Sequence, residues 1–72
     1  MSNNYAKRSR AEGEISTEEA ADRIGAHPAT LRRWAKEVML GKPAPLSKIR
    51  RDFAGRFWFN EEEVGELLDH RA

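Results

Sequence analysis

The stretch His27-Pro-Ala-Thr-Leu-Arg-Arg-Trp-Ala-Lys-Glu-Val38 decides the fold of this 72-residue chain. Its apolar side chains recur at the i, i+3, i+4 and i+7 spacing of one helical face, which predicts an amphipathic helix. Proline suits the first position of a helix, so the helix is expected to begin at Pro28 and to end by Gly41. The core-facing residues are Leu31, Trp34, Ala35 and Val38.

The side of this helix that cannot be buried carries its cations. It presents Ala29, Thr30, Arg32, Arg33 and Lys36. Such a face fits either an ordinary solvated helix or a recognition helix that contacts DNA, and the segments before and after it favour the second interpretation.

A shorter helix is predicted just before this one. Ser16 can cap it, and Glu19 lies three residues later, as in a capping box. Gly25 supplies the left-handed residue at which such a helix ends. Because only three residues then precede Pro28, a tight helix-turn-helix corner is favoured over a generic helical hairpin.

A β-hairpin is predicted after the helix pair, since prolines at positions 43 and 45 prevent further helix. Residues 46–52 and 56–59 flank a turn around Gly55, and the aromatic second segment favours strand. Phe57 and Phe59 should face the core, with Trp58 on the opposite side. Four cations are expected near the hairpin tip, where they either contact phosphates or a minor groove, or are only solvated. They are Lys48, Arg50, Arg51 and Arg56.

A third helix is predicted from the end of the hairpin towards the end of the chain. Asn60 can cap it, and Glu63 is placed to complete a second capping box. The side chains expected on its buried stripe are Val64, Leu67 and Leu68.

Length and composition exclude several classes of function. A chain of 72 residues forms one small domain without room for a sizeable catalytic cleft. Its residues also offer no combination of a nucleophile, a base and a group that orients the base, so no enzymatic activity is expected. Without cysteine, and with His27 and His70 lacking partners at ligand spacing, no metal or cofactor is expected. No apolar run suits a membrane span or signal peptide, which predicts a cytoplasmic protein without membrane association.

Charge is strongly segregated along the chain, although the net charge is only +1. Residues 27–58 contain eight basic and two acidic side chains, a local net charge of +6, whereas residues 12–26 and the tail from residue 59 are acidic. If the basic segment occupies one side of the fold, that side would bind a polyanion, for which a nucleic acid is the obvious candidate.

The first fourteen residues are polar and lack periodicity, so they are expected to be a disordered lead-in to a domain that spans residues 15–72. Their cations are Lys7, Arg8 and Arg10. This basic cluster is either an arm that follows phosphates or a solubilising tail.

Two segments, ISTEEAADRIGAHPATLRRWAKE and APLSKIRRDFAGRFWFNEEEV, carry a resemblance to a known family. Residues 15–68 resemble the phage excisionases, or recombination directionality factors. The shared features are a capped first helix, a short turn, a second helix that begins with proline, a hairpin that follows a proline, and a third helix. The excisionases belong to the MerR-like winged helix-turn-helix group. His27 departs from the family, which often has a capping serine there, and the segment before Gly55 is longer than usual.

This resemblance implies a mainly α fold with a small β-hairpin, in which three helices are joined by a wing. The second helix would enter the major groove, with Ala29 and Arg33 at the base edges. The wing would contact the neighbouring minor groove or the backbone. Because arginine bonded to guanine through two hydrogen bonds is the commonest specific contact, Arg33 is the first candidate for base recognition. The residues assigned to the DNA backbone beside that helix are Thr30, Arg32 and Lys36.

The same resemblance implies bending of double-stranded DNA and partnership with an integrase in prophage excision, without a small-molecule effector. With no dimerisation element expected, the chain should be a monomer that associates head to tail on direct repeats, in the cytoplasm of a bacterial host. Two alternatives share the fold: a small MerR-like transcriptional regulator, and the DNA-recognition domain of a phage terminase small subunit.

Overall fold

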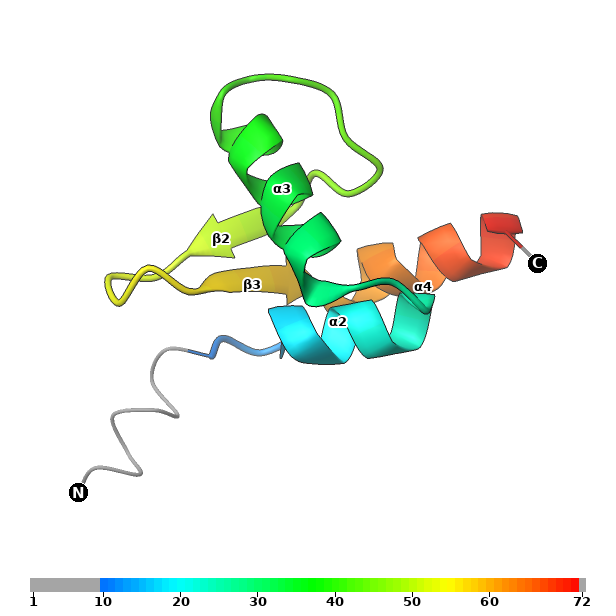
Figure 1. Ribbon diagram of the computed structural model, residues 1–72. Coiled ribbons are helices and arrows are strands. Elements are labelled where there is room, and N and C mark those ends of the chain that lie inside the picture. The colour runs from blue at the N-terminus through cyan, green and yellow to red at the C-terminus, as the bar shows by residue number, and fades with distance from the viewer. Residues whose placement is uncertain (1–9, 72) are drawn as a thin grey trace.

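Three helices and a small three-stranded antiparallel sheet make up the described part of the chain (Figure 1). The computed structural model describes residues 10–71, except for the side chain of residue 71. The three predicted helices and the hairpin are confirmed, but a further strand makes the architecture mixed α/β. In chain order the elements are β1 (Glu14–Ser16), α2 (Thr17–Ile24), α3 (Pro28–Met39), β2 (Ile49–Arg51), β3 (Phe57–Asn60) and α4 (Glu61–Arg71).

The ends of α2 and α3 lie where the sequence predicted them. Ser16 caps α2, because its Oγ accepts a hydrogen bond from the backbone N–H of Glu19 at 3.1 Å. Gly25 ends α2 in the left-handed conformation, with φ of 80°. Three residues later α3 begins at Pro28, so the expected tight connection between the two helices is present.

Helix α4 begins at its predicted cap but without the predicted reciprocal capping box. Asn60 Oδ1 accepts a hydrogen bond from the N–H of Glu63 at 2.8 Å, which confirms the cap. The Glu63 carboxylate instead accepts hydrogen bonds from the N–H and hydroxyl of Ser47 and from the N–H of Lys48. The reason is that the N–H of Asn60 donates to the carbonyl of Lys48. Glu63 therefore ties the loop after α3 to the start of α4.

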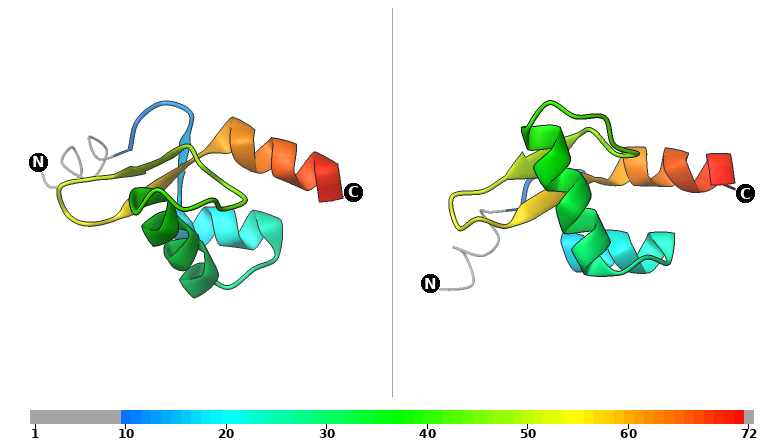
Figure 2. Two further views of the ribbon diagram at one scale, coloured as in Figure 1. Left: turned by 90° about the horizontal axis from the view of Figure 1, so that it is seen from above. Right: turned by 45° about the horizontal axis from the view of Figure 1, so that its top comes forward.

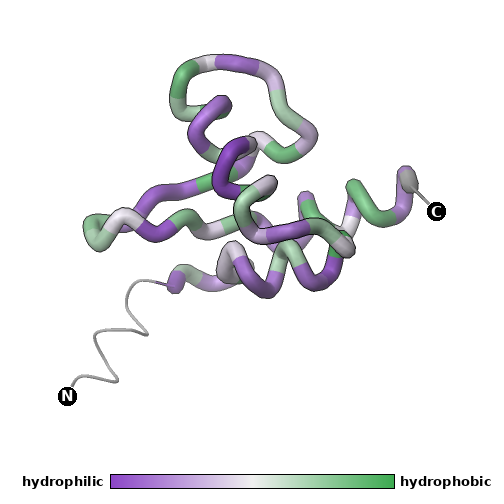
Figure 3. The backbone as a smooth tube through the Cα atoms, viewed as in Figure 1, coloured by the Kyte–Doolittle hydropathy of each residue, from purple (hydrophilic) through white to green (hydrophobic). Residues whose placement is uncertain are grey.

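Strand β3 is the centre of the sheet, with β1 and β2 antiparallel on either side of it. Phe59 stands between Ile15 and Ile49 in the register, and all three contribute to the core. Helices α2 and α3 cover this face of the sheet, while α4 continues beyond its end (Figure 2). Residues of α2, α3 and β3 form this core. Hydrophobic and hydrophilic residues alternate along these elements (Figure 3).

Trp58 is on the opposite face of the sheet from Phe57 and Phe59, as predicted, yet it is buried as well. Each strand presents alternate residues to its two faces, and β1 turns β3 from an edge strand into a central one. The indole N–H of Trp58 donates to Asp52 Oδ2 at 2.8 Å, so its one polar atom is satisfied. Asp52 therefore anchors Trp58 on the second face of the sheet.

The fold includes residues that were expected to belong to a disordered lead-in. Residues 10–13 lead into β1, where Arg10 Nε donates to the carbonyl of Glu14 at 2.9 Å. The carbonyl of Gly13 accepts a hydrogen bond from the N–H of Glu61 at 2.8 Å. The ordered domain thus begins before residue 15, because the free edge of β3 offers hydrogen-bond partners to this segment. Lys7 and Arg8 lie outside the described residues.

Candidate nucleic-acid interface

Helix α3 turns its charged side away from the core, as its spacing predicted. Leu31 and Ala35 are fully buried, and Trp34 packs against the core. On the other side, Thr30 is half-buried and the remaining predicted site residues are exposed. Those exposed residues are Ala29, Arg32, Arg33 and Lys36.

His27 holds the start of this helix. Its Nδ1 accepts a hydrogen bond from the backbone N–H of Ala29 at 3.0 Å, so histidine supplies the cap expected of a serine. Accepting through Nδ1 requires the neutral tautomer that carries its proton on Nε2. The His27 cap therefore fixes the geometry of the first turn, where Ala29 and Thr30 lie.

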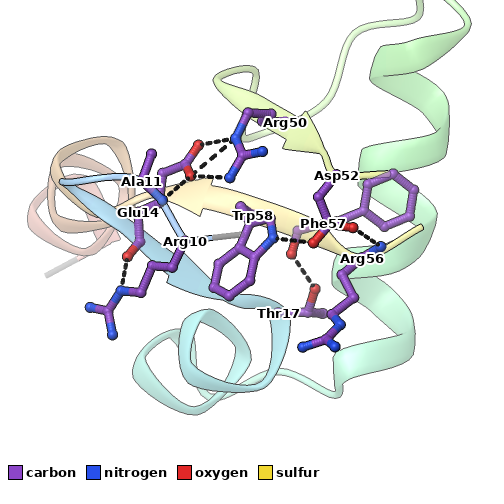
Figure 4. A network of polar contacts seen from close by, with 9 residues as sticks. All are labelled: Arg10, Ala11, Glu14, Thr17, Arg50, Asp52, Arg56, Phe57 and Trp58. Carbon is purple, nitrogen blue, oxygen red and sulfur yellow. Dashed lines mark hydrogen bonds and ion pairs between the residues drawn. The ribbon is translucent and has the colours of Figure 1, made fainter. Parts of the chain in front are cut away.

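A buried carboxylate fixes the tip of the hairpin. Asp52 is 7% exposed, and its Oδ1 accepts a hydrogen bond from the N–H of Arg56 at 2.9 Å (Figure 4). The same Oδ1 accepts a second hydrogen bond from the N–H of Ala54, also at 2.9 Å. The hydrogen bond from Trp58 makes the largest contribution to lowering the pKa of Asp52 below its ordinary value of 3.8, and the hydrogen bonds from the two backbone N–H groups lower it further. Sequence reasoning missed this role, although an aspartate that opens a short Gly-containing turn is a recognised signal.

A groove of about 380 Å³ lies where the start of α2, helix α3 and the hairpin meet. Arg32 and Lys36 line it from α3, and Arg51 and Arg56 line it from the hairpin. Four of the predicted site cations, separated by up to 24 positions in sequence, are therefore brought to one concave surface. Such a concentration of positive charge in a groove favours the binding of a polyanion.

Two of these groove cations also have partners within the chain. Arg32 Nη2 lies 3.0 Å from Glu18 Oε2, and both side chains are exposed. The Arg51 guanidinium lies 5.6 Å from the centroid of the Phe57 ring. An exposed ion pair contributes little to folding and exchanges readily, so Arg32 can leave Glu18 for a phosphate.

Arg50 is not among the residues that line the groove, and it lies on the opposite face of the sheet from Arg51, because side chains alternate along β2. Its Nη2 donates to Glu14 Oε1 at 2.8 Å and its Nε to Oε2 at 3.0 Å, across the central strand (Figure 4). This bond from Arg50 outweighs the effect of burial and lowers the pKa of Glu14 from its ordinary 4.5. Arg50 thus joins β2 to β1, and its replacement is expected to reduce stability.

Lys48 is also separate from the hairpin tip, so the expected cluster of four cations there is wrong. It precedes β2, at the end of the hairpin farthest from the turn, and its N–H donates to Glu63 at 2.8 Å. Its side chain is exposed beside the start of α4. The tip region therefore contains Arg51 and Arg56, while Lys48 and Arg50 are placed elsewhere by strand length and side-chain alternation.

Acid is expected to destabilise this protein through Glu14 and Asp52. Both carboxyl groups have a pKa below the ordinary value in the folded chain, so their stabilising effect is complete above about pH 4.5 and is lost as the pH falls through the folded pKa values. Thermal denaturation should show that Glu14→Gln lowers the melting temperature at pH 6. The difference from the parent chain should shrink as the pH approaches 2.

Glu62→Gln, at an exposed position of α4, is the matched control and should leave the pH profile unchanged. An equal effect of Glu14→Gln at pH 6 and at pH 2 would contradict a stabilising ionised bond between Glu14 and Arg50.

Within the described part of the chain, residues 10–71, no group of three His, Cys, Asp or Glu side chains is placed to hold a metal ion. No helix among those residues is long and apolar enough to cross a membrane. Comparison of the chain with protein-family models, curated proteins and solved structures gave no match.

Proposed function

We propose that this chain is a sequence-specific DNA-binding protein of the winged helix-turn-helix type. Helix α3 acts as the recognition helix in the major groove, and the β2–β3 hairpin is the wing that contacts the adjoining minor groove or backbone. The observation that carries the proposal is the groove in which Arg32 and Lys36 of α3 meet Arg51 and Arg56 of the hairpin.

The dimensions of α3 suit this role. Its 12 residues give a length of about 18 Å, and a helix with its side chains fits the major groove, which is about 12 Å wide. Arg33 lies on the exposed side with enough reach to form two hydrogen bonds with guanine. Ala29 is small enough for close approach of the first turn to base edges. In this proposal Lys36 and Arg32 contact phosphates, which position the helix without reading sequence.

Substitution at Arg33 and at Lys36 should separate base recognition from backbone binding. A preferred site is first selected from random duplexes. Arg33→Ala should then reduce the binding free energy for that site by about 1–3 kcal/mol and relax the preference at one base pair. Lys36→Ala should weaken selected and random duplexes by the same factor, because a phosphate contact carries no sequence information. Fluorescence anisotropy titrations with both duplexes measure the two effects.

The melting temperatures of both variants serve as the folding control, since each side chain is exposed and neither should change stability by more than about 0.5 kcal/mol. If Arg33→Ala weakened selected and random DNA equally, Arg33 would have no role in base recognition.

The finer proposal is that the protein acts as an excisionase that binds direct repeats cooperatively. The hairpin and the far end of the acidic helix α4 lie at opposite ends of the molecule, whose longest extent is 41 Å (Figure 1). This polarity supports a head-to-tail contact between neighbours on DNA, which does not close and so can propagate. Stimulation of excision in an assay with the cognate integrase tests the role. DNA binding without stimulation would favour a transcriptional regulator.

A further inference from the structure

Phe53, at the tip of the hairpin, is the most exposed large hydrophobic residue among those described. It is 75% exposed, compared with 73% for Leu40 and 47% for Met39 at the end of α3. A single exposed apolar residue is common on protein surfaces. Phe53 is different because its position is rigidly defined and because it belongs to the hairpin whose cations line the groove.

The backbone around Phe53 is held by hydrogen bonds on both sides. The N–H of Asp52 donates to the carbonyl of Arg56 at 2.9 Å, and the N–H of Gly55 donates to the carbonyl of Asp52 at 3.0 Å. Gly55 has φ of 85°, the left-handed conformation that closes three-residue hairpin loops. The Asp52 carboxylate adds its two bonds to the N–H groups of the loop. A ligand therefore meets a loop that needs little further ordering, which favours binding.

The turn itself does not require an aromatic residue at position 53. Its second position accepts most residues, with proline preferred, whereas the left-handed position requires the glycine that is present. With three-quarters of its surface exposed, the phenyl ring also contributes little to the core, which is formed by other residues. The phenyl ring is therefore an apolar group with three-quarters of its surface exposed at the tip of the hairpin.

We propose that Phe53 is a wedge that inserts between two base pairs from the minor groove and kinks the DNA held by α3 and the hairpin. This inference rests on the proposed DNA-binding function. Apolar side chains at the tips of minor-groove-binding elements unstack a base step and bend the duplex by on the order of 20–90°. The steps that unstack most easily are pyrimidine–purine steps, so we expect insertion there.

The charges around Phe53 favour DNA over an apolar protein partner. Arg51 and Arg56 lie on either side of the loop, and both line the cationic groove. The minor groove, about 6 Å wide, is bordered by phosphates on both edges, so a narrow tip with an apolar centre and cationic flanks is complementary to it. A hydrophobic protein pocket would instead have to remove water from both guanidinium groups, which is costly.

The test uses the full chain and a duplex selected from a random pool, with 2-aminopurine placed in turn at each pyrimidine–purine step. Binding of the parent chain should raise the fluorescence at one step about twofold or more, as the base unstacks, and should shorten the end-to-end distance measured by energy transfer. Phe53→Ala should abolish both signals. Its affinity should fall by less than about tenfold, since the cost of unstacking the base pairs offsets most of the stabilisation that insertion provides.

Two further variants complete the test. Phe53→Leu should retain part of the signal, because a leucine can also act as a wedge. Leu40→Ala, which removes an equally exposed apolar side chain at the end of α3, should leave bending and fluorescence unchanged. If Phe53→Ala bent and unstacked the duplex as the parent chain does, the proposal that Phe53 inserts between base pairs would be wrong, while the proposal of DNA binding would be unaffected. If the parent chain selected no duplex, the proposed function itself would fail, and the wedge with it.

Discussion

Replacing Phe59 with alanine is expected to remove about 3–5 kcal/mol from the free energy of unfolding, the usual cost of truncating a buried phenylalanine. Phe59 is 1% exposed and stands between Ile15 and Ile49 on the central strand. The core of a domain this small rarely supplies more than about 3–5 kcal/mol, so the variant should be largely unfolded at 25 °C. Urea denaturation followed by circular dichroism measures the loss.

Phe53→Ala is the matched control, since it makes the same chemical change at a position that is 75% exposed. Its free energy of unfolding should stay within about 0.5 kcal/mol of that of the parent chain. Similar losses at the two positions would contradict the assignment of Phe59 to the core and of Phe53 to the surface.

Raising the monovalent salt concentration from about 50 to 200 mM is expected to weaken DNA binding by about 300- to 1,000-fold. This factor assumes about five phosphate contacts, which correspond to a slope of log K against log salt of roughly −4 to −5. The segment from residue 27 to residue 58, with its net charge of +6, supplies the cations. Anisotropy titrations of a random-sequence duplex at several salt concentrations give the slope, and a slope near zero would refute nucleic-acid binding.

Two single substitutions test whether the salt dependence of DNA binding comes from the cations that line the groove. Arg56→Gln removes a cation that lines the groove and should make the slope less steep by about 1. Arg50→Gln removes the same charge from the opposite face of the sheet, where Arg50 is bonded to Glu14, and should leave the slope unchanged. Equal changes for the two variants would show that both faces contact DNA.

The helices could be predicted from sequence because their signals are local. Ser16, Gly25 and Asn60 each act within a few residues of the helix end they define, and each does so in the structure. The spacing that predicted buried Leu31 and Ala35 also placed Arg33 and Lys36 on the exposed side. That part of the candidate interface follows from helical periodicity alone, since a helix determines the directions of its own side chains.

The hairpin could be predicted from sequence as a turn between two short strands. The segments that pair with it or bond to it could not. Strand β1 has only three residues, too few for a recognisable alternation, and it exists because β3 offers it an edge. That pairing buries Trp58 on the second face and brings Glu14 to Arg50, 36 residues away in sequence. Likewise Glu63, a plausible capping-box residue by spacing, holds a loop 15–16 residues earlier in the chain.

The sequence by itself therefore determined the helices, most of the residues on their core-facing sides and the cationic side of α3, all of which follow from spacing within about four residues along the chain. The tertiary structure alone decided which hairpin cations join that side. Arg51 and Arg56 reach the groove, whereas Arg50 faces away and Lys48 lies at the other end of the hairpin. For Arg50 and Arg51 the physical reason is that a strand sends successive side chains to opposite faces, and only its pairing with distant segments establishes which face meets α3.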